Sequence, residues 1–196
     1  MGGTVTTSVH HHLATITFFH PAHNSMPGHL LAELTKQIRE AGESEDVHLI
    51  LLQSGGSRTF CAGASFDELL TITNSSDGKK FFLGFANVIN AIRKCPKIII
   101  GRVQGKAIGG AVGIAAATDY CMASQYGSVK LSELALGIGP FVVGPAIERK
   151  IGLSAFNNLA INATEWQTAL WAKDKGLYNE VFDSIDQLYK YLDHFL

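Results

Sequence analysis

Apolar residues recur along this chain at two different spacings, which follow one another from the N-terminus onward. Leu13–Phe19 partly alternates apolar with polar residues, which predicts a strand. His20-Pro21 ends this strand, because a residue before proline is disfavoured in the helical region. A helix is predicted next, since Pro27 is a favoured first-turn residue, Gly42 is the expected stop, and four apolar residues share one helical face. These four are Leu30, Leu31, Leu34 and Ile38.

The alternation of strand and helix patterns continues through the middle of the chain. A buried strand is predicted at 47–52, a helix at about 80–93 and a further strand at 97–103. A helix of small residues after Gly110 and a strand near 120–123 complete the series. The pattern predicts a layered α/β domain. Between these elements, residues 73–78 (TNSSDG) collect turn-forming residues, which predicts a mobile loop.

The C-terminal part, from Phe141 onward, has a mostly helical pattern. Thr164 is the predicted N-cap of one helix and Gly176 its predicted stop, followed by an extended piece at 178–182. The last segment, 185–196, is amphipathic, so it must cover either its own domain or another subunit. Its apolar stripe is Ile185, Leu188, Tyr189, Leu192 and Phe195. We expect one domain over 1–196, with a core at about 1–140 and a mostly helical region at about 141–196.

Composition excludes several classes of protein. The chain has 196 residues, 46% of them hydrophobic, which is enough for one sizeable core. Sixteen basic and seventeen acidic residues give a net charge of -1 without a basic stripe, so nucleic acid is not an expected partner. The apolar stretch at 111–117 is far shorter than the ~20 residues that span a bilayer. Met1 is not followed by a secretory signal, so a cytoplasmic location is expected.

The cysteines and a run of histidines do not predict a metal or a disulfide. Cys61, Cys95 and Cys121 are odd in number and lack CxxC spacing, so we expect reduced thiols, two of them buried. The three histidines at 10–12 cannot all converge on one ion if they lie in a strand, because successive residues alternate faces. A solvated or hairpin position is predicted for them.

Two glycine-rich segments carry the candidate chemistry. In FCAGAS (60–65), small side chains leave the backbone amides bare, and Ser65 is a good N-cap for a helix at 66–70. GKAIGGA (105–111) offers a second bare amide at a helix start. Two such amides converging on one carbonyl oxygen would stabilise an enolate. Each segment taken alone also fits an ordinary tight turn. Neither GxGxxG nor GxxxxGK[ST] occurs in the chain.

Four motifs in order resemble those of the enoyl-CoA hydratase/isomerase, or crotonase, superfamily. They are FCAGAS at 60–65, VQGKAIGG at 103–110, Thr118-Asp119 at the end of the following helix, and LSELALGIGP at 131–140. His20-Pro21 with Asn24-Ser25 resembles the turn after the family's first strand. No single motif is specific, but four in this order cover most of the chain.

The resemblance implies a spiral of repeated ββα units, an assembly built on trimers, and a coenzyme A thioester as substrate. The thioester oxygen would meet the amides of Ala64 and Gly110. Ala62, Gly63, Ser65, Gly109 and Gly113 would line the substrate site, and Arg58 and Lys106 are candidates for the phosphates of coenzyme A. Solvated charges are an equal alternative for these two cations. No metal or redox cofactor is expected. The family's further C-terminal helices are expected to be missing after Leu196, so the helical C-terminal region is expected to be shortened.

The acidic residues narrow the expected reaction. Hydratases of this family carry two glutamates, and the positions that match them here are Gly113 and Glu133, the latter after Ser132 instead of proline. One carboxylate is enough to move a proton from C2 to C4 of a 3-enoyl thioester, so the pattern favours an isomerase with Glu133 as the base. Asp119 is expected to be structural, and Asp67 and Glu68 to favour a helix dipole.

Other readings of the same residues remain open. Hydration, decarboxylation or thioester hydrolysis could use the same fold and amides with other groups in place of the missing acid. A non-catalytic acyl-CoA-binding protein is an alternative from another class. A serine protease is disfavoured, because no histidine lies between Phe60 and Gly139 to activate Ser65 or Ser132.

Overall fold

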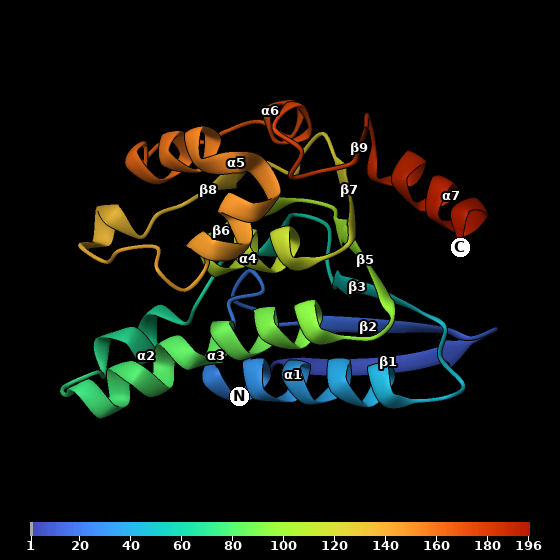
Figure 1. Cartoon of the computed structure of the whole chain (residues 1–196), viewed down its shortest axis with the longest axis horizontal. Coiled ribbons are helices and arrows are strands. Elements are labelled where there is room, and N and C mark those ends of the chain that lie inside the picture. The colour runs from blue at the N-terminus through green and yellow to red at the C-terminus, as the bar shows by residue number, and fades with distance from the viewer. Residues whose placement is uncertain (1) are drawn as a thin grey trace.

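Two β-sheets form the frame of the computed structural model, which describes residues 2–196 (Figure 1). In the larger sheet the strand order is β1-β2-β3-β5-β7-β9, and only the β1–β2 pair is antiparallel. Its strands are β1 Thr4–His10, β2 Leu13–Phe19, β3 Leu49–Ser54, β5 Ile98–Val103, β7 Tyr120–Ser124 and β9 Glu180–Phe182. The smaller sheet is parallel, with the order β4 Thr59–Cys61, β6 Lys106–Ile108 and β8 Val129–Lys130.

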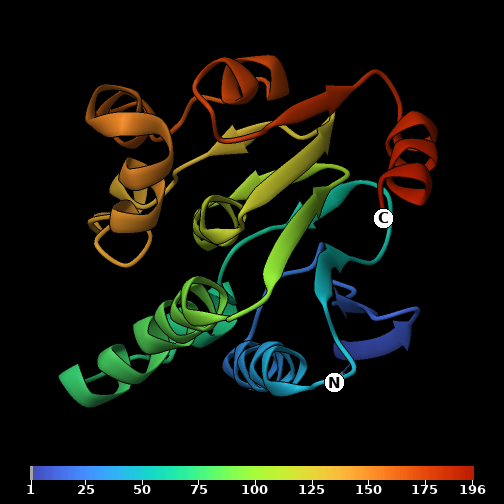
Figure 2. The ribbon, with the colours of Figure 1, turned by 45° about the vertical axis from the view of Figure 1, so that its right-hand side comes forward.

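The chain visits the two sheets in turn. β3, β5 and β7 are each followed by a strand of the smaller sheet and then by helices, which gives the expected spiral of ββα units (Figure 2). The helices are α2 Phe66–Leu70 and α3 Ser75–Lys94, then α4 Gly110–Ala117, then η1 Leu134–Leu136 and α5 Gly144–Ile161. Because β4, β6 and β8 are parallel, their carboxyl ends lie together, and the segments that follow them leave the smaller sheet on the same side.

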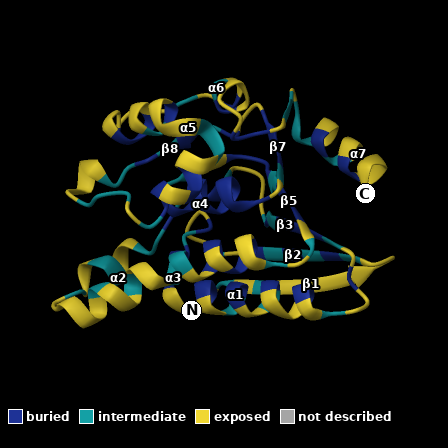
Figure 3. Ribbon diagram, viewed as in Figure 1, coloured by how far each residue is buried: buried dark blue, intermediate teal, exposed yellow. Residues whose placement is uncertain are grey.

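Four helices packed one on another bury the centre of the molecule. α1 Gly28–Glu43 packs on α3, α3 on α4, and α4 on α5. All eight residues of α4 are buried, and its small side chains let the neighbouring elements approach closely (Figure 3). Asp119, just after α4, accepts a hydrogen bond from the Ile99 amide at 2.8 Å, so it has the structural role expected for it.

The C-terminal helix covers the larger sheet of its own chain. α7 Ile185–Phe195 begins at Ser184, whose hydroxyl accepts from the Gln187 amide at 3.1 Å. Its buried residues Leu188 and Leu192 pack with three residues of the sheet, Leu51, Ile100 and Met122. Of the two expectations for this amphipathic segment, the structure supports contact with its own domain.

Several expected boundaries need correction. The segment 73–78 is not a loop throughout, because α3 begins at Ser75, where the Asn74 side chain accepts from the Asp77 amide at 3.0 Å. Residues that cap helices are the same types that make turns, which explains the wrong prediction. Thr164 is not an N-cap either. That role belongs to Thr168, which starts α6 Ala169–Asp174 and accepts from the Trp171 amide at 3.1 Å. β1 was not predicted, and its residues are mostly exposed.

The expected hairpin position of the histidines and the expected state of the cysteines are confirmed. His11 and His12 form the turn of the β1–β2 hairpin with positive φ. Cys61 and Cys121 are buried free thiols, and Cys95 is half-buried. Among the described helices, none is both long and apolar enough to cross a membrane.

Candidate active site

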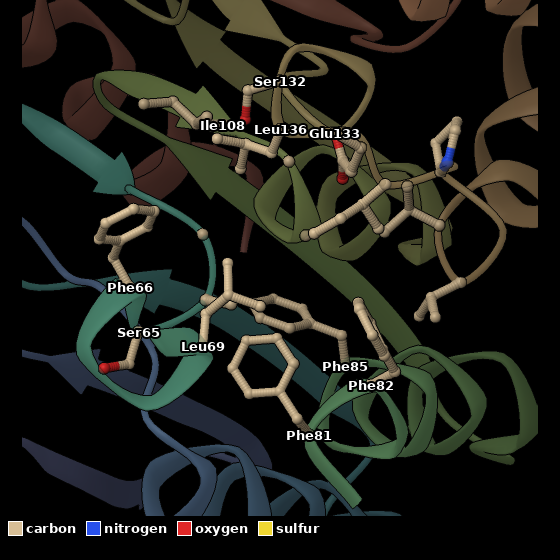
Figure 4. A pocket seen from close by; sticks show the side chains of 18 of the residues that line it. Ser65, Phe66, Leu69, Phe81, Phe82, Phe85, Ile108, Ser132, Glu133 and Leu136 are labelled. Atoms are coloured by element: carbon tan, nitrogen blue, oxygen red, sulfur yellow. The ribbon is translucent and has the colours of Figure 1, made fainter. Parts of the chain in front are cut away.

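A cavity of about 240 Å³ lies where the segments after β4, β6 and β8 meet α3. Figure 4 shows the aromatic side chains of Phe81, Phe82 and Phe85 on one side of this cavity. Glu133 lies on the opposite side, with Ser132 and Leu136 near it. The cavity therefore joins residues that lie far apart in the sequence.

The first wall of the cavity is the segment 62–65, which is held by its backbone. Gly63 has a φ of 89°, which favours glycine, and its amide donates to the Cys61 sulfur at 3.3 Å. The Ala62 amide donates to the His23 carbonyl at 3.2 Å, and the Met26 amide donates to the Gly63 carbonyl at 2.8 Å. Ser65 caps α2 as expected, accepting from the Glu68 amide at 3.3 Å. These contacts fix the segment against residues 23–26.

The buried side chain of Asn24 helps to hold this arrangement in place through hydrogen bonds to the backbone. Asn24 donates through Nδ2 to the carbonyls of Gly55 and Thr59, at 2.8 and 2.9 Å, and its Oδ1 accepts from the His20 amide at 2.9 Å. Sequence reasoning noted Asn24 only as part of a turn. Glu68 has a comparable structural task, because its carboxylate accepts from the Gly28 amide at the start of α1 at 2.8 Å.

The second wall comes from Gly109 and Gly110, between β6 and α4. Gly109 has φ 56° and ψ -119°, and its amide donates to the Lys130 carbonyl at 2.9 Å. Gly110 is the first residue of α4, so its amide has no partner within the helix. The Phe85 ring packs directly on Gly110, and a β-carbon there would lie 2.6 Å from Cζ of that ring. Phe85 therefore leaves room for glycine only.

The two walls approach each other closely. A β-carbon on Gly63 would lie 3.0 Å from the Ile108 carbonyl oxygen and 4.0 Å from the Gly110 amide nitrogen. Across residues 2–196, neither the Ala64 amide nor the Gly110 amide donates a hydrogen bond to the protein. Both residues line the cavity, as do Ala62, Gly63, Ser65 and Gly109. The geometry thus leaves two bare amides at one cavity.

Glu133 is the only ionisable residue in the described lining of the cavity. Its Oε2 is buried and has no hydrogen-bond partner, and its Oε1 would lie 3.2 Å from a β-carbon on Gly109. Burial raises the pKa of the Glu133 carboxyl above its ordinary value, because desolvation disfavours the charged form. A carboxylate in this state is suited to accept a proton.

The remaining residues expected at the site lie elsewhere. Gly113 does not line the cavity, and a β-carbon there would lie 2.7 Å from Val143 Cγ1 and 2.9 Å from Ile89 Cδ1. Arg58 is exposed and also lies outside the lining. Lys106 is exposed too, with its ammonium 4.7 Å from the centre of the Trp166 ring.

Sequence reasoning did not single out the aromatic part of the cavity wall. Four phenylalanines form it, from α2 and α3. They are Phe66, Phe81, Phe82 and Phe85. The FF pair at 81–82 with Phe85 one helical turn later was a usable signal, because residues three or four apart share a helix face.

Comparison with known proteins gives a consistent result. Residues 8–194 match the family described as enoyl-CoA hydratase/isomerase. An ethylmalonyl-CoA decarboxylase of Gallus gallus is 27% identical over 67% of this chain and 44% of its own length. The enoyl-CoA hydratase ACTT6 of Alternaria alternata is 31% identical over 74% of this chain and 47% of its own length. The matched region thus spans about half the length of these two curated relatives.

A solved structure shares nearly the whole fold. The crystal structure of a putative enoyl CoA hydratase/isomerase (crotonase) from Legionella pneumophila superposes with a TM-score of 0.91 at 27% identity. The match covers 97% of this chain and 74% of that one. The α/β spiral expected from the sequence is therefore confirmed.

Proposed function

This chain belongs to the enoyl-CoA hydratase/isomerase family, and we propose that within it the chain is an isomerase that moves a double bond in an acyl-CoA thioester. The observation that carries the proposal is the single carboxylate of the cavity. Glu133 lies among apolar groups with a raised pKa, beside two bare amides. One base and one oxyanion site are the groups that a proton shift needs.

The proposed reaction begins with a 3-enoyl thioester. The Glu133 carboxylate takes a proton from C2, and the electron pair spreads over the thioester oxygen and the former C3–C4 double bond. The resulting dienolate takes the same proton back at C4, which leaves the double bond between C2 and C3. A positioned general base of this kind contributes ~10² to 10⁴ in rate.

The amides of Ala64 and Gly110 would hold the thioester oxygen while negative charge develops on it. Both belong to segments fixed by backbone hydrogen bonds, so they need little reorganisation when the charge appears. Removal of one donor of this type costs ~10² to 10³ in rate. The need to keep these two amides accessible also explains why the segments consist of small residues, since larger side chains would cover the amides.

The apolar walls favour a neutral acyl group. No lysine, arginine or histidine occurs in the described lining of the cavity, so a second carboxylate on the acyl group would lie near Glu133 without a counter-charge. This disfavours the decarboxylation of a dicarboxylic thioester, the activity named for the relative from Gallus gallus. Hydration is the second candidate, because the relative from Alternaria alternata is named a hydratase.

The test measures both reactions on the same protein. Wild type is expected to convert 3-enoyl-CoA to the conjugated 2-enoyl thioester, and Glu133→Gln should lose ~10² to 10⁴ of that rate. Glu148→Gln is the matched control, because Glu148 is an exposed carboxylate of α5 outside the cavity. Undiminished isomerisation in Glu133→Gln would exclude Glu133 as the base. Hydration of 2-enoyl-CoA by wild type without isomerisation would favour the second candidate.

A further inference from the structure

Val143 forms the part of the cavity wall next to α4. It lies directly before α5, is only 3% exposed, and is a lining residue of the cavity. Its side chain also contacts α4, since a β-carbon on Gly113 would lie 2.7 Å from Val143 Cγ1 and 2.9 Å from Val143 Cβ. One valine therefore fills the space between the cavity and the buried helix.

Other apolar residues lie next to Val143 in the wall and at the contact with α4. Ile89 of α3 completes the contact with Gly113, and Val142 precedes Val143 in the lining. A side chain as small as that of alanine at Gly113 would be too close to both Val143 and Ile89, so α4 cannot offer a polar group to the cavity at this position. The wall is closed by packing and not only by the lack of a side chain on glycine.

A closed apolar wall determines where water can be held. A buried water needs two to four polar partners. Around this cavity the described polar side chains are those of Ser65, Ser132 and Glu133, and the Ser65 hydroxyl already accepts from the Glu68 amide. Gly113, on which Val143 packs, offers a water no side-chain partner.

We propose that Val143 is a specificity-determining residue that keeps water away from the reacting carbons, so that the conjugated product leaves without being hydrated. The inference rests on the proposed isomerase function. The excluded reaction would add water to the 2-enoyl thioester: the hydroxyl oxygen bonds to C3, the C2–C3 double bond becomes single, and C2 gains a proton. The Val143 methyl groups occupy space that such a water would otherwise share.

The test opens this wall without changing the base or the amides. Val143→Ser removes two methyl groups and adds a hydroxyl that can hold a water, and Val143→Ala removes the same bulk without the hydroxyl. Val181→Ser is the matched control, because Val181 is a half-buried valine of β9 outside the cavity. Each protein is assayed for isomerisation of 3-enoyl-CoA and for hydration of 2-enoyl-CoA. Thermal unfolding confirms that each variant is folded.

The expected result is a change in the ratio of the two rates. Val143→Ser should raise hydration relative to isomerisation by about tenfold, the factor that one ordinary hydrogen bond provides, and Val143→Ala by less. Val181→Ser should leave the ratio near that of wild type. Equal ratios in wild type and both folded Val143 variants would overturn the inference, as would the same gain in Val181→Ser.

Failure of the proposed function gives a different result. Wild type would then fail to isomerise 3-enoyl-CoA, whatever the variants do. In that case the hydration rate alone tests Val143: a gain in Val143→Ser over both wild type and Val181→Ser supports its role in excluding water. A wild type that already hydrates as fast as the Val143 variants overturns that role.

Discussion

Gly110→Ala tests the packing that presents the second amide. The new β-carbon would lie 2.6 Å from Phe85 Cζ, whereas carbon atoms in contact are about 3.5 to 4.0 Å apart. Either the ring or the first turn of α4 must therefore move by ~1 Å, because both are buried. Overpacking of this kind costs about 1 to 3 kcal/mol of unfolding free energy. A shift of the Gly110 amide should also reduce kcat/KM by ~10² to 10³.

Two measurements check the expected effects of Gly110→Ala: urea denaturation for stability, and isomerisation of 3-enoyl-CoA for kcat/KM. Gly78→Ala is the control, because Gly78 lies in α3 with Ile72 Cγ2 3.6 Å from the new β-carbon, an ordinary contact. This control should keep full activity and gain up to ~1 kcal/mol from helix propensity. Adding Phe85→Leu to Gly110→Ala should recover part of the lost stability. Wild-type stability and kcat/KM in Gly110→Ala would refute the packing argument.

Further predictions concern Glu133 and Asn24. Burial raises the pKa of Glu133 above 4.5, so kcat/KM should decline with falling pH earlier than for an ordinary glutamate, and a pH–rate profile checks this. The folded state then binds the proton more tightly than the unfolded state, and this stabilisation is lost as pH rises through the raised pKa. Glu133→Gln should therefore be more stable than wild type at pH 7, and this difference should shrink below pH 4.5. A difference in urea midpoint between the two proteins that is the same at both pH values would contradict the prediction. Asn24→Ala leaves the Gly55 carbonyl and the His20 amide without the partner that Asn24 provides, while the Thr59 carbonyl keeps a hydrogen bond from Gln104 Nε2. The change should cost about 1 to 3 kcal/mol in urea denaturation, whereas a loss below about 0.5 kcal/mol would show that water replaces the side chain.

The sequence predicted most of the fold because its elements are locally consistent. The strand at Leu13–Phe19 has the predicted bounds, and the helix after Gly110 and the Ser65 cap are also present. Errors occurred where one residue type has two uses, as at Asn74 and Thr168, whose side chains cap helices. Nothing in local spacing distinguishes a capping residue from a turn residue until the following helix is placed.

The candidate site was predicted in part. The motifs indicated the segments around Ala64 and Gly110 and the carboxylate of Glu133, because these positions depend on order along the chain. The side chains that surround them depend on tertiary packing, which spacing does not encode. The contacts of Val143 with Gly113, and of Phe85 with Gly110, each join elements that are distant in sequence and could be found only from the structure.

The backbone bonds that link residues 23–26 to residues 62–63 bear on how the molecule acquires its activity. These contacts span about 40 residues of sequence, so they form only after a costly loop closure, and the bare amide of Ala64 depends on them. Turnover during refolding should therefore appear with the slowest structural phase, after helical signal has recovered. Circular dichroism would then overestimate the fraction of active molecules early in refolding, while the catalytic rate would count only chains in which residues 23–26 have docked on residues 62–63.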